Sequence, residues 1–274
     1  MISPKQKSSV YFNQNFVSQK ENKILAIDLG NTNIHWCYIN NGIIDGKYSI
    51  IKNFDFCNLS WDEIKKQDLP VVIAGATHYL AKDLKEIKKR FNIKFIELTS
   101  DKQSTIKNIY PGLGIDRICN LTAAFKYFQK NEKNLKSNII VFDFGTATTV
   151  SCCDQSGQFI GGLIHSGIET ELKAVSREMP ALPKVEIAKV QSKINSLPTN
   201  TEEAILNAVL IGQIGFINHF LDLFKEKHGE AKIVFTGGNA ELILKLSNIQ
   251  HDLFDPLLTV KGIYYNYTGK LVHK

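Results

Sequence analysis

Two acidic turns that contain glycine stand far apart in the chain, and each follows a short apolar run. The first reads Asp28-Leu29-Gly30-Asn31-Thr32-Asn33, and the second reads Asp143-Phe144-Gly145-Thr146-Ala147-Thr148-Thr149. Glycine just past a strand lets the backbone approach a phosphate closely, and nearby amide and hydroxyl groups donate to its oxygens. A carboxylate there repels phosphate unless Mg²⁺ lies between them. Either turn alone is also an ordinary hairpin or strand start, but the pair predicts a clamp over the phosphates of one nucleotide.

A third segment places an aspartate and an arginine after two glycines, at the predicted start of a helix. It reads Tyr110-Pro111-Gly112-Leu113-Gly114-Ile115-Asp116-Arg117. Asp116 could accept a proton from a substrate hydroxyl, and Arg117 could hold a carboxylate or phosphate with two hydrogen bonds. The alternative is that Asp116 stabilises the helix N-terminus and Arg117 forms a surface ion pair. The phosphate clamp nearby favours the first interpretation.

A fourth segment, Thr236-Gly237-Gly238-Asn239, follows a late predicted strand. Its small residues would allow an adenine ring to lie against the backbone. The alternative is a simple strand–turn–helix without a ligand. The sequence lacks the motifs of several other enzyme classes. The P-loop, Rossmann, zinc-protease and serine-hydrolase motifs are all missing from the sequence. His165 lies near the expected cleft, where packing explains it best. The sequence therefore favours a nucleotide-dependent enzyme without a P-loop.

The elements around these turns repeat in one order. Strands are expected at residues 23–29, 33–39 and 43–50, and again at 138–144, 148–153 and 158–164, each set followed by helices that alternate with strands. An internal repeat of this kind fixes the architecture. We therefore expect an α/β fold of two β-β-β-α-β-α-β halves, 23–135 and 136–274, with a nucleotide cleft between them. Residues 1–22 are polar and are expected to form a flexible N-terminal extension.

Bulk properties narrow the class of protein further. The 274 residues carry a net charge of +6, from scattered lysines without a nucleic-acid motif. This charge is expected to form a solvated surface that favours nucleotides and acidic substrates, with no nucleic-acid partner. The odd number of cysteines, without CxxC spacing, argues against disulfides or zinc and favours a reducing cytoplasm. No apolar stretch reaches the length of a bilayer span, so no membrane partner is expected.

Taken together, the segments DLGNT, GLGIDR, DFGTATT with a following GG-x-I, and TGG resemble the type III pantothenate kinase family over about residues 23–265. The resemblance implies an actin-like (ribonuclease H-like) fold and ATP-dependent phosphorylation of the 4′-hydroxyl of pantothenate, the first step of coenzyme A synthesis. It also implies Mg²⁺, a monovalent cation (K⁺ or NH₄⁺) and a homodimer. Two alternatives stay open: an inactive regulatory relative of the same fold, and an actin-like phosphotransferase acting on another hydroxyl.

The same resemblance implies roles for individual residues. Asp116 is similar to the family's proton acceptor, Asp143 to its monovalent-cation ligand, and Asp28 to a residue near Mg²⁺. The implied ATP contacts are Asp28, Leu29, Gly30, Asn31, Thr32, Asn33, Ile34, His35, Gly145, Thr146, Thr148, Gly237 and Gly238. The implied pantothenate contacts are Gly114, Ile115, Asp116, Arg117, Thr201 and Tyr110. The chain departs from the family pattern at His35, where lysine is frequent, at His165-Ser166, where Ala-Pro is common, and at Lys107, near the usual place of a substrate tyrosine.

Overall fold

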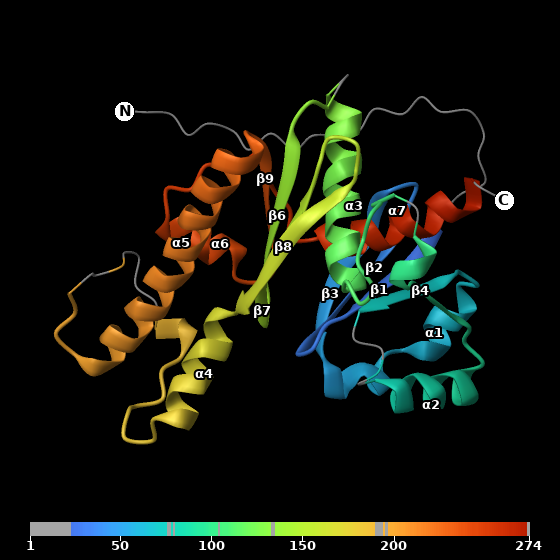
Figure 1. The fold of residues 1–274 in the computed structure, drawn as a ribbon. Helices are drawn as coiled ribbons and strands as arrows, with labels where there is room; N and C mark the ends of the chain where they lie inside the picture. The colour runs from blue at the N-terminus through green and yellow to red at the C-terminus, as the bar shows by residue number, and fades with distance from the viewer. Residues whose placement is uncertain are drawn as a thin grey trace, which may run out of the picture.

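The described residues form two five-stranded mixed sheets that stand side by side in Figure 1. The computed structural model describes residues 23–75, 78, 80–103, 105–132, 135–189, 194 and 197–272. The expected extension at residues 1–22 lies outside these ranges. The expected alternation of helices and strands in an α/β fold is confirmed.

The first sheet has the strand order β3-β2-β1-β4-β5. Its strands are β1 (Lys23–Leu29), β2 (Asn33–Asn40), β3 (Ile43–Lys52), β4 (Val71–Gly75) and β5 (Phe95–Glu97). β1, β2 and β3 pair antiparallel, whereas β4 and β5 run parallel to β1. β2 and β3 form a hairpin, in which Asn41 and Gly42 adopt φ of 50° and 80°. Positive φ at both central residues is what a type I′ turn requires.

The second sheet repeats this order as β10-β9-β6-β7-β8. Its strands are β6 (Asn138–Phe144), β7 (Ala147–Cys153), β8 (Phe159–Ser166), β9 (Ala231–Thr236) and β10 (Leu253–Phe254). β6 is the central strand, antiparallel to β7 and parallel to β9, as β1 is to β2 and β4. The central strands of both sheets are almost completely buried, which explains their unbroken apolar sequences. The predicted internal repeat is therefore present in the fold.

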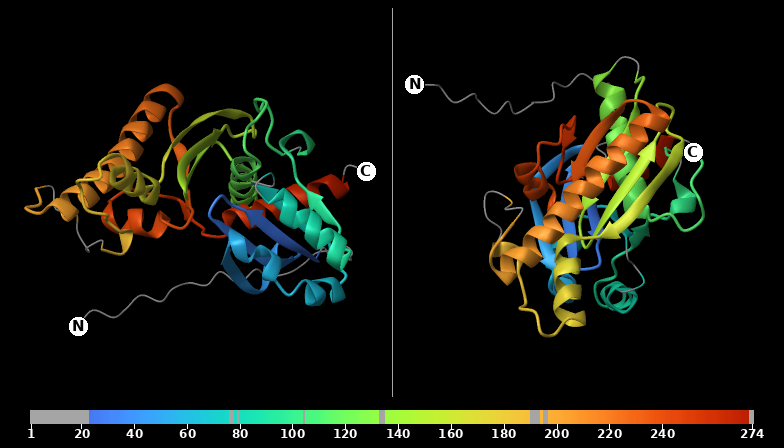
Figure 2. Two further views of the ribbon diagram at one scale, coloured as in Figure 1. Left: turned by 90° about the horizontal axis from the view of Figure 1, so that it is seen from below. Right: turned by 60° about the vertical axis from the view of Figure 1, so that its left-hand side comes forward.

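Seven α-helices surround the sheets in the described part of the chain. They are α1 (Trp61–Lys66), α2 (Ala81–Phe91), α3 (Ile115–Asn131), α4 (Ile168–Glu178), α5 (Thr201–His228), α6 (Ala240–Leu246) and α7 (Leu258–Val272). Short 3₁₀ helices lie at Asn53–Asn58, Ser100–Lys102 and Ile187–Lys189. In both views of Figure 2, α1 and α2 group with the first sheet, and α4, α5 and α6 with the second.

Helix α3 lies between the two sheets and packs on both of them. Its Ile118 and Leu121 belong to an apolar cluster with Val141 of the second sheet. Its Cys119 belongs to another cluster, with Ile24 and Ala26 of the first sheet. α3 therefore joins the two halves through side-chain packing as well as through the chain.

Helix α7, the last element of the chain, returns to the first sheet. Val260 and Ile263 pack in the same cluster as Ile24 of β1. α7 crosses α3 so closely that a Cβ on Gly262 would lie 2.0 Å from the carbonyl oxygen of Cys119. The division into halves at residues 135 and 136 remains a prediction. Helix α7 belongs to the second half by sequence but packs on the sheet of the first half.

Helix α5 carries two different faces. Leu206, Val209, Leu210, Ile217 and Phe224 are buried against the second sheet. Within the described ranges, α5 is the one helix that is long and apolar enough to cross a membrane, a test that core helices also pass. Only 28% of its most apolar window is buried, so a second apolar face points outward.

Candidate active site

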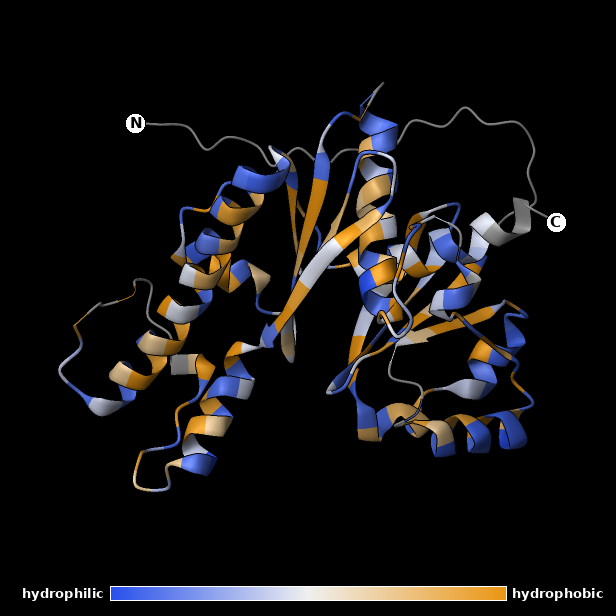
Figure 3. Ribbon diagram, in the orientation of Figure 1, coloured by the Kyte–Doolittle hydropathy of each residue, from blue (hydrophilic) through white to orange (hydrophobic). Residues whose placement is uncertain are grey.

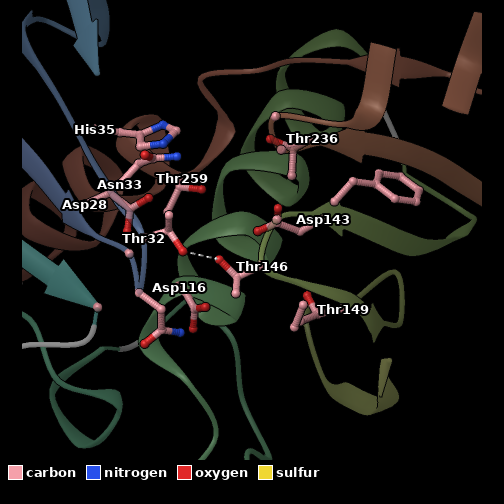
Figure 4. Close-up of a pocket in the computed structure, with 18 of the residues that line it drawn as sticks. Asp28, Thr32, Asn33, His35, Asp116, Asp143, Thr146, Thr149, Thr236 and Thr259 are labelled. Atoms are coloured by element: carbon pink, nitrogen blue, oxygen red, sulfur yellow. Dashed lines mark hydrogen bonds between the residues drawn. The ribbon is translucent and has the colours of Figure 1, made fainter. Parts of the chain in front are cut away.

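The four motifs meet at one cavity of about 560 Å³ between the two sheets. This volume lies in the range of small-molecule sites. The predicted residues in its wall are Asp28, Leu29, Gly30, Asn31, Thr32, Asn33, His35, Gly114, Ile115, Asp116, Asp143, Gly145, Thr146, Gly237 and Gly238. Residues that are far apart in the sequence thus share one site, as Figure 4 shows for the labelled side chains.

The two acidic turns face each other directly across this cavity. The hydroxyl oxygens of Thr32 and Thr146 are 3.0 Å apart and share a hydrogen bond (Figure 4). Thr32 follows β1 and Thr146 follows β6, the matching strands of the two sheets. The expected convergence of the turns is therefore a direct result of the repeated topology.

Two predicted ATP contacts lie outside the cavity wall because side chains alternate along a strand. Ile34 on β2 is fully buried in the first core, while its neighbours Asn33 and His35 line the cavity. On β7, Thr148 is buried and donates to Gln213 Oε1 at 3.0 Å. Its neighbour Thr149 lines the cavity instead.

Three predicted pantothenate contacts also lie outside this wall. The guanidinium of Arg117 is buried and donates to Ser151 Oγ at 2.8 Å, to the Val150 carbonyl at 2.7 Å and to the Tyr110 hydroxyl at 3.2 Å. These bonds tie Arg117 and Tyr110 to β7. Thr201 is exposed at the start of α5 and is not part of the cavity either.

Three carboxyl groups form the charged centre of the cavity. Burial raises the pKa of Asp28 well above its usual value, and the charges of Asp116 and Asp143 raise it further. Burial likewise raises the pKa of Asp143 to about 6, with a further contribution from Asp116 and an opposing one from the Asn120 hydrogen bond. This accumulation of negative charge favours a bound cation.

The donor set of the same centre limits which metal ions it can bind. No group of three His, Cys, Asp or Glu side chains in the described ranges could hold a metal ion by itself. Mg²⁺ normally binds one or two carboxylates together with water and phosphate oxygens. The arrangement of Asp28 and Asp143 therefore fits a cation that arrives with a phosphate group.

Asp143 is held in place by a chain of hydrogen bonds from α3 and α7. Asn120 Nδ2 of α3 donates to Asp143 Oδ2 at 2.8 Å, and the Thr259 hydroxyl of α7 donates to Asn120 Oδ1 at 2.8 Å. Gly237, with φ of 92°, leaves room on the other side, since a Cβ there would lie 2.5 Å from Asp143 Oδ1. Asn120 and Thr259 could not be predicted from the sequence, because only the folded chain brings α3 and α7 to β6.

His35 lines the cavity beside Asp28, its antiparallel partner on β1. The Tyr48 hydroxyl of β3 forms a hydrogen bond with His35 Nδ1, and the two rings meet edge to face. Burial lowers the pKa of His35, so its ring is neutral at pH 7. At position 35 a neutral imidazole therefore takes the place of the lysine that is frequent in the family that the sequence resembles.

The wall opposite β1 comes from α4 and was not predicted. Glu169, Thr170 and Lys173 line it, and the Thr170 hydroxyl donates to the Thr146 carbonyl at 2.6 Å. This bond connects the first turn of α4 to the second acidic turn. Gly167, which precedes α4, is needed there because a Cβ would lie 2.2 Å from the Gly145 carbonyl oxygen.

His165 does not line the cavity: its ring packs on Phe216, as expected.

Comparison with known proteins connects this site to a family. The family model described as type III pantothenate kinase matches residues 24–222. A type III pantothenate kinase from Agathobacter rectalis is 30% identical over 265 residues, covering 89% of this chain and 96% of that protein.

Solved structures support the fold. A conserved Baf-family protein from Campylobacter jejuni has a TM-score of 0.61 at 22% identity, covering 91% of this chain and 100% of that one. MreB5 from Spiroplasma citri, solved with bound ADP, has a TM-score of 0.50 at 11% identity, covering 92% of this chain and 99% of that one. These likenesses confirm the predicted actin-like fold. The family match spans most of the sequence and contains the cavity's acidic turns, so the chain belongs to the type III pantothenate kinase family.

Proposed function

We propose that this protein transfers the γ-phosphoryl group of ATP to the 4′-hydroxyl of pantothenate, the first step of coenzyme A synthesis. The observation that carries the proposal is the meeting of both acidic turns and Asp116 at one cavity, in a chain of this family. An inactive regulatory relative would not need the three carboxylates Asp28, Asp116 and Asp143 there. A kinase acting on another hydroxyl is opposed by the family match.

Different residues of the cavity would bind ATP, pantothenate and the two cations. The backbone of the turns at Gly30 and Gly145, with the hydroxyls of Thr32 and Thr146, would hold the phosphates of ATP, and Gly237 and Gly238 would lie against the adenine. Gly114 and Ile115 would hold pantothenate beside Asp116. Mg²⁺ would be held near Asp28 and K⁺ or NH₄⁺ at Asp143, where they would neutralise phosphate charge.

Phosphoryl transfer needs positioning and charge neutralisation more than covalent chemistry with the protein. Asp116 would orient the 4′-hydroxyl and accept its proton as the hydroxyl oxygen bonds to the γ-phosphorus. The bond from that phosphorus to the β,γ-bridging oxygen would break, leaving ADP and 4′-phosphopantothenate.

The direct test is ATP consumption with pantothenate in potassium, ammonium or sodium buffers. We expect ADP and 4′-phosphopantothenate in equal amounts, and faster turnover in potassium or ammonium than in sodium. Pantothenate that lacks its 4′-hydroxyl serves as the control and should give no ADP above background. Failure to consume ATP with pantothenate in any buffer would contradict the proposed function, and equal rates in all three would contradict the cation site.

The cytoplasm is the proposed location of the protein. The five cysteines, all within the described ranges, form no disulfide. Burial raises the pKa of Cys152 to about 12, which keeps this thiol protonated and unreactive. Cysteines of this kind suit a reducing compartment.

A homodimer is the proposed assembly, and two neighbouring apolar surfaces support it. Strand β8, at the edge of the second sheet, exposes Ile160, Leu163 and Ile164. Hydrophobic residues recur along α5 beside it (Figure 3), and Ile211 and Leu223 are exposed there. An apolar edge strand next to an apolar helix is a surface that a monomer normally covers.

Light scattering should therefore give twice the chain mass of 30.9 kDa. Ile211→Glu should shift the protein to monomer, because a charge at an apolar interface loses its water without a partner. Ile43→Glu is the matched control, since Ile43 is similarly exposed (47% against 44%) but lies on the first sheet. A wild-type monomer at micromolar concentration would contradict the assembly.

A further inference from the structure

The first acidic turn is supported by a residue outside every motif. Asn53 directly follows β3 and begins the 3₁₀ helix beside the turn. Its Nδ2 donates to the carbonyl oxygen of Gly30 at 3.0 Å and to that of Asn31 at 2.8 Å. Its backbone N–H donates to the carbonyl oxygen of Thr32 at 3.4 Å. Three consecutive carbonyl groups of the turn are thus directed at Asn53.

The orientation of these carbonyls determines where the turn's amide groups point. In a planar trans peptide, the C=O and the following N–H point in opposite directions. The N–H groups of Asn31 and Thr32 therefore point away from Asn53. Asn31 and Thr32 line the cavity, whereas Asn53 does not. Successive backbone N–H groups turned to one side form a binding surface for anions.

The chemistry at position 53 fits a donor to the turn. The amide nitrogen has two hydrogens, and the two carbonyls accept one each. Among the described residues, Asn53 Oδ1 is buried and has no hydrogen-bond partner. A buried acceptor without a partner destabilises the fold, so the donor end of the amide is what makes asparagine useful here. The adjacent Lys52 reinforces the same support, because its Nζ donates to Asn33 Oδ1 at 2.8 Å.

We propose that Asn53 is a positioning residue for the phosphoryl donor: its amide fixes the first acidic turn so that the turn's N–H groups face the donor's phosphates. This inference rests on the proposed function for the identity of the donor, ATP. Asn53 acts through Gly30 and Asn31 and does not touch the ligand. Its loss should weaken the binding of ATP and leave the binding of pantothenate unaffected.

Asn53→Asp is the sharpest variant, because it keeps the shape of the side chain and replaces the donor with oxygens that repel both carbonyls. We expect the KM for ATP to rise about ten- to a hundredfold, the scale of a misplaced binding group. The KM for pantothenate should stay within about twofold of wild type, since Asn53 has no contact with Gly114 or Asp116. Asn58→Asp adds the same charge at the exposed end of the same 3₁₀ helix and should change neither value.

Two further variants separate positioning from folding. Asn53→Ala removes the donor without adding charge and should raise the KM for ATP in the same direction. Asn53→Ser keeps one donor and should recover part of the affinity. A wild-type KM for ATP in the alanine variant would overturn the inference, as would equal increases in both KM values. If the aspartate variant does not fold, the alanine and serine variants decide the matter alone.

The failure of this inference can be told apart from failure of the proposed function. If the wild-type protein does not phosphorylate pantothenate, binding of Mg²⁺ with a non-hydrolysable ATP analogue is measured by calorimetry in the same variants. A weaker affinity in Asn53→Ala would support the role of Asn53 even then. An unchanged affinity would overturn it, whatever the substrate.

Discussion

Asp116→Asn should lower kcat by about 10²-fold or more while the protein still folds and binds ATP. The carboxylate lies in the first turn of α3 and in the cavity wall. Asparagine has a similar shape but cannot accept the proton of the substrate hydroxyl, and loss of a general base typically has this size of effect. Steady-state kinetics and the Kd of an ATP analogue, measured on the same preparations, separate turnover from binding.

The control for this prediction tests the alternative role of Asp116 as a helix-end charge. Asp62 also lies in the first turn of a helix, α1, and is exposed. Asp62→Asn removes the same interaction with the helix dipole, worth about 0.3–1 kcal/mol at a surface, and should leave kcat unchanged. If Asp116→Asn turned over normally and only lost stability, Asp116 would be a structural residue.

Asp143→Asn should make the ligand-free protein more stable above pH 6 and, at the same time, poorly active. The folded protein raises the pKa of Asp143 from the ordinary value of 3.8 to about 6. Well below pH 4 the carboxyl is protonated in both the folded and unfolded states and does not change the free energy of unfolding. Between pH 4 and 6 only the unfolded state ionises fully, so stability falls as the pH rises, and above pH 6 the loss is complete. Two pKa units correspond to a loss on the order of 3 kcal/mol.

The asparagine variant avoids this loss, because its side chain has no charge to bury. Its Tm should exceed that of wild type at pH 8 and match it near pH 4, in a buffer without K⁺ or NH₄⁺. Potassium added together with an ATP analogue should raise the Tm of wild type more than it raises the Tm of the variant. A variant that is less stable than wild type at pH 8 would show that the carboxylate is already compensated within the protein, against the proposed cation site.

Much of the site could be predicted because its turns are local. An apolar run followed by aspartate and glycine determines both the strand and the place where it ends, so the turns at Gly30 and Gly145 were found from sequence. Which neighbour faces the cavity could not be found in this way. Thr148 and Thr149 differ only in the strand face on which they lie, and pairing of β7 with β6 and β8 decides that face.

Other parts depend on contacts that the sequence pattern does not contain. Arg117 was expected to bind substrate, but its guanidinium is buried against Ser151 and Val150 of β7. Tyr48 reaches His35, and Asn53 reaches the first turn, only because β3 folds back along β2. Helix α7 was missed because it lacks a clear apolar stripe: it is buried on several sides, with polar Asn266 inside it 3% exposed. Such features follow from long-range packing, which local patterns do not report.

The return of α7 to the first sheet has a consequence for the order in which the protein is made. Synthesis proceeds from the N-terminus, and domains generally fold as they emerge from the ribosome. Here Ile24, Ala26 and Cys119 are translated well before their covering residues Val260 and Ile263. The first sheet therefore remains incomplete until residues 258–272 have emerged, whereas the strands of the second sheet are already synthesised. We expect a nascent chain stalled before residue 258 to expose this apolar surface to chaperones.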